Sequence, residues 1–487
     1  MKRIYIFLVL ICVAFCGVAQ PRNVFFEGQF EGASGKRVML IRYSDPLSQR
    51  EIVADSVTID SNNHFTLSTF VDYPTLVVIE VEDYSQSFYV EAGRTYRMRL
   101  EGFDWCADER VNVHIHPVTL PIVFDGLPED ELNLAIGRFE MLCDSFLVAN
   151  GTHLDLRYRP ERRYFDTLKG IVNHTEFGHK SDFFDRYKTY RMAEMEYNLG
   201  LSSREGIFNR LVKNEPIRYY DESYMSLVLT LFSNAVSQGT KRIRKYQLTN
   251  WVASSDVAGY ADALGAEPLL KNERLRELVM LEALWESYFD REDYNYEKVY
   301  AMVDRIGQSS KFEEHRRLAQ DLCESMMRVE GKEVNLEEGF VFCDERRGAV
   351  SLDSLRGKWL YVAFIRVDDA NSVGEMETMA HFRDTVYAMW GDSVAFVTIV
   401  CDREFQKMYH FLNNRQHSRR YEWQWLHFDG NYDFLNKVGV VAYPTFVLFD
   451  PSGKCVDNYA PWPGSGYLTR GPWVKKEVQE KEHLFKF

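Results

Sequence analysis

Cysteine is scarce in this sequence, and its spacing excludes several kinds of protein. The 487 residues contain eight cysteines, and no two of them form a C-x-x-C pair. Their spacings fit neither a disulfide framework nor a zinc-binding pattern. We therefore expect most of them to be small buried hydrophobic residues, while an isolated disulfide between two of them stays open.

Runs of like charge, low-complexity tracts and internal repeats are also missing. The 58 basic residues are outnumbered by 72 acidic ones, which gives a formal net charge of −14. This balance argues against a protein that binds nucleic acid or an anionic membrane surface. The hydrophobic share of 46% and the aromatic share of 14% predict a globular chain. Its length is sufficient for about three domains of ordinary size.

A long apolar run stands at the start of the chain. Lys2 and Arg3 precede twelve apolar residues that end at Phe15, and the small residues 17–19 follow. This pattern predicts a cleaved secretory signal peptide over residues 1–19, too short to span a bilayer. A lipoprotein anchor at Cys16 is disfavoured because bulky Phe15 stands where a small residue is needed. We expect a periplasmic or secreted protein without a transmembrane segment in its mature chain.

Residues 20–125 have the pattern of a β-domain. Short runs rich in β-branched and aromatic residues alternate with turn signals, at 37–43, 64–69, 75–83, 87–93 and 95–102. This spacing predicts an N-terminal β-sandwich. His114 and His116 lie two apart and could hold a metal ion. Because no third ligand is near, an exposed strand face is the better interpretation, and we expect neither a metal nor a cofactor.

Residues 126–333 change to a period of 3.6, which predicts a helical middle domain of about seven or eight helices. Residues 128–148, for example, place one apolar stripe on a helix, formed by Leu132, Ile136, Phe139, Leu142, Cys143 and Phe146. Such stripes are most simply explained as core, and no residue pattern here indicates chemistry.

Residues 334–487 alternate between strands and helices. Two apolar strands are predicted at 360–367 and 393–402, and the helix between them carries a stripe formed by Met376, Met379, Phe382, Val386 and Met389. Residues 443–461 read as a hairpin that turns at residues 451–453. This alternation, together with the closing hairpin, predicts an α/β domain with a mixed sheet. The whole chain is thus expected to be a multidomain α+β protein.

The C-terminal part resembles the thioredoxin superfamily through "VSLDSLRGKWLYVAFI" at 350–365 and "VGVVAYPTFVLFDPSGK" at 438–454. It is most similar to exported thiol-disulfide oxidoreductases of the TlpA/ResA type, which serve cell redox homeostasis. The whole chain also resembles an envelope group with an N-terminal β-domain, a helical middle and a C-terminal thioredoxin-like domain. The resemblance implies a thioredoxin-like fold over 334–487 and a cis-proline at Tyr443-Pro444.

The active-site turn of that family is degenerate here. Its two cysteine positions are Asp369 and Ser372, and Asp368 stands in place of its tryptophan. Thiol-disulfide exchange needs a thiolate and a second, resolving thiol, so this activity does not carry over. The S-x-x-E spacing of Ser372 and Glu375 instead predicts a capping box, with Asp369 favourably placed at the helix start. A cation site that also uses Asn371 is the rival interpretation.

Two functions remain open. The first is a redox-inactive module that binds an envelope protein or peptide, and it is not an enzyme. Its binding residues would be Asp368, Asp369, Glu375, Tyr443 and Pro444, with the acidic pair favouring basic or neutral segments. The alternative is a thiol-disulfide oxidoreductase or peroxidase that uses a displaced cysteine, Cys401 or Cys343.

Overall fold

The structure is a computed structural model. It describes residues 23–82, 84–103, 105, 118–154, 160–234, 236–291, 293–329, 334–336, 339–402, 404–414, 421–440, 442–465, 467–469 and 471. The expected signal peptide at 1–19, Cys106, and the pair His114 and His116 lie outside these residues. Two compact units are present; the first ends at Leu227 and the second begins at Val228.

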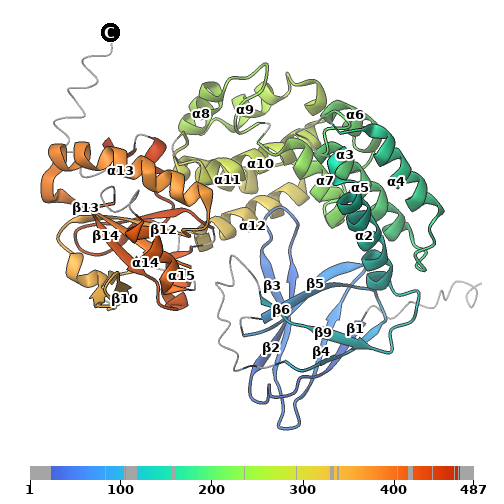
Figure 1. Cartoon of the computed structure of the whole chain (residues 1–487). Coiled ribbons are helices and arrows are strands. Elements are labelled where there is room, and N and C mark those ends of the chain that lie inside the picture. The colour runs from blue at the N-terminus through green and yellow to red at the C-terminus, as the bar shows by residue number, and fades with distance from the viewer. Residues whose placement is uncertain are drawn as a thin grey trace, which may run out of the picture. The chain divides into compact units, whose positions relative to one another are not determined.

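The first unit contains two β-sheets (Figure 1). One has the order β4-β1-β7-β9, with bounds His64–Phe70, Asn23–Gln29, Thr95–Leu100 and Ile122–Asp125. The other has the order β3-β2-β5-β6-β8, with bounds Glu51–Thr58, Arg37–Tyr43, Thr75–Val81, Tyr84–Val90 and Val118–Thr119. The five strands predicted from the sequence are confirmed. The sequence analysis did not single out β3, whose residues are nowhere fully buried.

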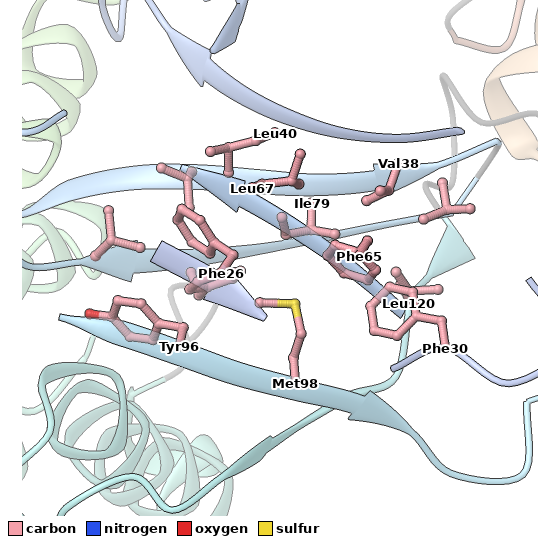
Figure 2. Packing of buried hydrophobic residues seen from close by; sticks show 14 of the residues in the cluster. Phe26, Phe30, Val38, Leu40, Phe65, Leu67, Ile79, Tyr96, Met98 and Leu120 are labelled. Atoms are coloured by element: carbon pink, nitrogen blue, oxygen red, sulfur yellow. The ribbon is translucent and has the colours of Figure 1, made fainter. Parts of the chain in front are cut away.

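Both sheets contribute side chains to one hydrophobic core (Figure 2). Phe26, Tyr96 and Met98 come from the first sheet, and Leu40 and Ile79 from the second. Residues of β1 alternate strictly between exposed and buried, as expected for a strand with one face on a core. The rings of Phe26 and Tyr96 stack at 5.9 Å. Burial of these side chains is the main stabilising contribution in this region.

Helices follow in both units. Those of the region up to residue 329 are α2 (Leu132–Ala149), α3 (Gly151–Leu154), α4 (Arg162–His174), α5 (Asp182–Asn198), α6 (Arg204–Leu211), α7 (Glu222–Phe232), α8 (Lys245–Ser254), α9 (Val257–Leu264), α10 (Glu273–Phe289), α11 (Tyr296–Ser309) and α12 (Glu313–Val329). These are more helices than the seven or eight expected, because short ones such as α3 carry no full amphipathic period. Helix α2 begins at Leu132, where the Glu131 side chain accepts a hydrogen bond from the Leu134 N–H.

The second unit ends in a seven-stranded mixed sheet, coloured orange to red in Figure 1. Its order is β11-β10-β14-β13-β12-β15-β16, with bounds Ala349–Ser351, Val341–Asp344, Gln424–His427, Val394–Val400, Trp359–Ile365, Thr445–Phe449 and Cys455–Asp457. Strands β12, β13 and β14 are parallel, while β15 is antiparallel to both β12 and β16. The predicted mixed sheet and closing hairpin are therefore confirmed.

Both faces of this sheet are covered. The helices are α13 (Ala370–Trp390), α14 (Phe405–Asn413) and α15 (Tyr432–Val438). Tyr361 and Ala363 of β12 belong to the core that includes α13, whereas Val362 and Phe364 belong to the core that includes α15. Burial on both faces explains why this strand is a continuous apolar run. Met389, the last residue of the predicted stripe, is 48% exposed and lies outside the core.

Gly28 marks a tight contact in the core of the first unit. It lies directly opposite Phe65 in the pairing of β1 with β4, and a Cβ atom at Gly28 would overlap the Phe65 ring. We expect Gly28→Ala to lower the free energy of unfolding by about 1–3 kcal/mol, the cost of forcing an extra methyl group into a packed core. Urea-induced unfolding followed by circular dichroism measures this change.

Gly170→Ala in α4 is the matched control, because no atom lies within 4 Å of the added Cβ. Alanine is the better helix former, so this variant should be unchanged or more stable by about 0.5–1 kcal/mol. Equal destabilisation by both substitutions would contradict the packing role of Gly28.

Candidate functional site

The turn between β12 and α13 is capped by Asp369. This residue is the N-cap, and its carboxylate accepts a hydrogen bond of 2.7 Å from the Ser372 N–H. Ser372 is fully buried in the first helical turn. The predicted capping box of Ser372 with Glu375 was therefore wrong, because the helix begins three residues earlier than the S-x-x-E pattern implied. Hydrogen bonds from Ser372 lower the pKa of the Asp369 carboxyl.

Asp368 belongs to a cluster of compensating charges. Its carboxylate accepts two hydrogen bonds of 3.1 Å from the Arg366 guanidinium and one of 2.9 Å from Lys407 of α14. These contacts, led by the one from Lys407, lower the pKa of Asp368. Lys407 also lies 3.6 Å from Asp402, a carboxylate that is only 1% exposed. Two cations thus face two carboxylates, and little charge is left at Asp368 to attract a basic segment.

Asp402 secures the same turn from the end of β13. Its carboxylate accepts a hydrogen bond of 2.7 Å from the Val367 N–H. Burial raises the pKa of Asp402, and the cations Arg366 and Lys407 act in the opposite direction. The sequence analysis missed this residue, although its place directly after a predicted buried strand was a usable signal.

The rival cation site is not supported. Asp368 is held by cations, Asp369 caps the helix, and Glu375 accepts a hydrogen bond of 3.4 Å from the Gly464 N–H. The carboxylates are thus directed to different partners. Within the described part of the chain, no group of three or more His, Cys, Asp or Glu residues is arranged to hold a metal ion.

The Tyr443–Pro444 peptide bond is cis, as the resemblance implied. Pro444 is buried, and Tyr443 is half-buried against the core below α15. Tyr443 also forms a hydrogen bond with the Cys401 thiol; burial raises the pKa of this thiol, and the bond lowers it to a smaller extent. Tyr443 therefore contributes to packing, and it does not line the pocket described next.

Pro444 and Glu375 line one pocket of about 370 Å³. The other walls come from the end of α10, from the start of β15 and from the segment after β16; they are Phe289, Asp290, Arg291, Thr445, Phe446, Tyr459, Ala460, Pro461, Trp462, Gly464 and Ser465. Asp368, Asp369 and Tyr443 are not part of this lining. The structure thus brings together only two of the five predicted binding residues.

Arg291 is the cation in this pocket, and the sequence analysis missed it. Its side chain is 6% exposed and donates a hydrogen bond of 2.9 Å to Asp457. The guanidinium also lies 4.1 Å from the centre of the Tyr296 ring. Its Nε and one terminal nitrogen are buried without a hydrogen-bond partner. Buried donors of this kind are uncommon, and here the guanidinium also lies 5.3 Å and 5.8 Å from the centres of the Tyr288 and Tyr459 rings.

Glu375 and Trp462 also line the pocket. Burial raises the pKa of Glu375, while the Gly464 N–H works against this shift. Trp462 is 49% exposed between two prolines, and Phe289 is 38% exposed. The usable sequence signal was this exposed tryptophan in a proline-rich segment, which has no place in a helical or strand period.

The displaced cysteines are poorly placed for thiol chemistry. Cys401 is 8% exposed, and burial raises the pKa of its thiol to about 12. Cys343 is half-buried, and its pKa is also raised by burial. The five cysteines in the described residues, at 143, 323, 343, 401 and 455, are all free. A raised pKa removes the thiolate that exchange chemistry needs at neutral pH.

Comparisons with known proteins find similarity over part of the chain. No family model matches it, and no curated protein matches it. The thioredoxin domain of a thiol-disulfide oxidoreductase from Bacteroides vulgatus is 21% identical, with a TM-score of 0.24, over 28% of this chain and 92% of that one. A thiol:disulfide interchange protein from Bacteroides sp. is 19% identical, with a TM-score of 0.25, over 31% of this chain and 96% of that one.

A secreted disulfide oxidoreductase from Mycobacterium tuberculosis is also similar. It is 18% identical, with a TM-score of 0.23, over 27% of this chain and 96% of that one. Each of these similarities covers less than a third of the chain. The site is therefore argued from its own residues.

Removing the cap tests the role of Asp369. Asp369→Ala should lower the free energy of unfolding at neutral pH by about 1 kcal/mol, the usual contribution of an N-cap side chain. Asp369→Asn keeps an oxygen acceptor and should lose less. Urea-induced unfolding at a series of pH values measures both effects.

The pH dependence follows from the lowered pKa of Asp369. The ionised carboxylate stabilises the fold above the unfolded-state pKa of about 3.9, and this contribution is lost as the pH falls through the lower folded-state value. The difference between the wild type and Asp369→Asn should therefore shrink in strong acid. A difference that does not change with pH would contradict the assignment.

Proposed function

We propose that this chain is an exported protein whose C-terminal thioredoxin-like domain has lost thiol chemistry and binds an extended segment of an envelope protein. In this proposal residues 20–125 form a β-sandwich, residues 126–333 a helical domain and residues 334–487 the binding domain. No helix in the described part of the chain is both long and apolar enough to cross a membrane.

The pocket beside Pro444 is the observation that supports binding. It joins the proline loop to the first turns of α13, and it adds an exposed tryptophan and a buried arginine from outside that loop. Tryptophan and arginine are enriched among the residues that dominate binding energy at protein interfaces. A concave surface with these two side chains fits the recognition of a protein segment.

Arg291 determines which chemistry the bound segment would offer. A guanidinium is positively charged and only donates hydrogen bonds, so its natural partner in a bound segment is a peptide carbonyl or a carboxylate. Asp290, the neighbouring carboxylate in the lining, is paired with Lys245 at 2.8 Å. We therefore infer a neutral or acidic segment, and this replaces the basic or neutral one expected from Asp368 and Asp369.

The loss of redox activity is inferred from the turn. Aspartate and serine occupy the positions where the resembling family has its two thiols. Cys401 is buried at the end of β13 with a raised pKa. The alternative, an oxidoreductase or peroxidase that uses Cys401 or Cys343, would require the protein to expose one of these thiols and lower its pKa.

Site-specific photo-crosslinking tests the binding function. We expect Trp462→p-benzoylphenylalanine to give discrete covalent adducts when the full chain is irradiated in native envelopes, because the probe then stands at the pocket rim. Adducts are detected by gel shift and identified by mass spectrometry. Arg291→Met should reduce their yield, and Arg291→Lys should reduce it less because one cation is retained.

Tyr246→p-benzoylphenylalanine is the matched control. Tyr246 lies on α8 in the same compact unit and is 60% exposed, and it is not one of the residues that line the pocket. The proposal fails if both positions give the same adducts, if position 462 gives none, or if Arg291→Met leaves the yield unchanged.

A further inference from the structure

A second cavity is formed by residues of the first unit alone. It has a volume of about 130 Å³, and its wall includes residues of the loop after β2, of the start of β5 and of the start of α7. Pockets that enclose a whole small molecule usually measure about 300–1,000 Å³. This cavity is therefore of a size to take a compact headgroup or the end of a side chain.

Five aromatic side chains contribute to its wall. Tyr43, Tyr73 and Tyr220 line it and are 37%, 43% and 47% exposed. The rings of Tyr73 and Tyr220 lie 5.9 Å apart at an angle of 31°. Tyr89 and Phe183 extend the wall inward, with ring centres 5.3 Å apart. The faces of such rings are negative and attract a cation within about 6 Å.

A carboxylate lies among these rings. Glu222, the first residue of α7, lines the cavity and accepts a hydrogen bond of 3.3 Å from the Tyr89 hydroxyl. Burial raises the pKa of Glu222, the Tyr89 hydroxyl works against the shift, and the neighbouring Asp221 adds to it. A partly buried carboxylate with a neutral donor is stabilised when a cation binds beside it.

Most of the charges that act on these tyrosines have the same sign as Glu222. Burial raises the pKa of the Tyr43 hydroxyl, and the negative charges of Glu51, Glu222 and Glu80 raise it further. Burial raises the pKa of Tyr73, and the positive charge of Arg42 works against this shift. One terminal nitrogen of Arg42 is already engaged, because it donates a hydrogen bond of 3.0 Å to the Phe70 carbonyl. Carboxylates therefore outnumber cations at the cavity, which favours a positively charged ligand.

We propose that this tyrosine cavity, formed by Tyr43, Tyr73, Tyr89, Tyr220 and Glu222, binds a small organic cation. The rings would surround the positive group, and the Glu222 carboxylate would neutralise it. Aromatic surroundings with one carboxylate suit a quaternary ammonium or a guanidinium, because both are weakly hydrated and present apolar surface together with charge. This site is independent of the pocket beside Pro444, so either can fail without the other.

Isothermal titration of the mature chain with two matched pairs of probes tests the proposal. Choline is compared with its uncharged isostere 3,3-dimethylbutan-1-ol, and methylguanidinium with N-methylurea. At least one cation should bind more tightly than its neutral partner by about tenfold or more, in line with the range for a desolvated cation–π contact. The pair that shows the larger ratio identifies the kind of cation.

Two variants connect binding to the cavity. Glu222→Gln keeps the shape and should weaken cation binding by about tenfold, and Tyr220→Ala should weaken it through loss of a ring. Glu205→Gln removes an exposed carboxylate of α6 in the same unit and should leave the affinity unchanged. Circular dichroism verifies that each variant is folded.

The proposal is overturned by any of three results. The first is that neither cation binds more tightly than its neutral partner. The second is that Glu222→Gln keeps the wild-type affinity, and the third is that Glu205→Gln weakens binding as much as Glu222→Gln does. Glu222→Gln and Tyr220→Ala change different positions of the cavity. If one of these two variants does not fold, the other still tests the proposal.

Discussion

The pairing of β12 on both edges and its burial on both faces fix the geometry of the C-terminal region. Phe364 lies opposite Thr445 of β15, and Ile365 lies opposite Val400 of β13. These pairings bring the turn after β12, the turn after β13 and the proline loop before β15 to the same end of the sheet. The candidate site is therefore a consequence of strand register, and a slip by one residue would reverse both faces.

At that end of the sheet, ion pairs and a helix cap hold the turn between β12 and α13. Asp369 satisfies backbone donors of α13, and Asp368 is held by two cations from opposite sides of the turn. Both arrangements stabilise the turn by fixing its side chains in place. Neither arrangement leaves a nucleophile or a proton acceptor free to react. The pocket lined by Pro444 and Glu375 is therefore the part of this region that is suited to binding.

The sequence predicted the elements whose patterns are local. A short stretch of sequence was enough to predict each of these features: the buried strand β12, the stripe of Met376 and Met379, and the hairpin that turns at residues 451–453. Proline at 444 and glutamate at 375 were predicted to share a surface because a resemblance placed them there, and the structure brings them together in one pocket.

Asp402 and Trp462 carried usable local signals, but other site residues could not be predicted because they depend on contacts between distant segments. Arg291 reaches the pocket from the end of α10, and its partner Asp457 lies 166 residues further along the chain. The tyrosine cavity joins residues of β2 and β5 to Glu222 of α7 in the same way. The helix start at Asp369 was also misplaced, since two overlapping capping patterns were available and only the tertiary position of Ser372 decides between them.

The proposed absence of thiol chemistry at the turn is tested most directly by reduction of insulin disulfides. The wild type should show no turnover above the uncatalysed rate with dithiothreitol, because residues 369 and 372 carry no sulfur. The double variant Asp369→Cys with Ser372→Cys is the matched control, since it restores two thiols on the same helix start. Turnover by the wild type that disappears in Cys401→Ser would contradict the account and establish a displaced-cysteine enzyme.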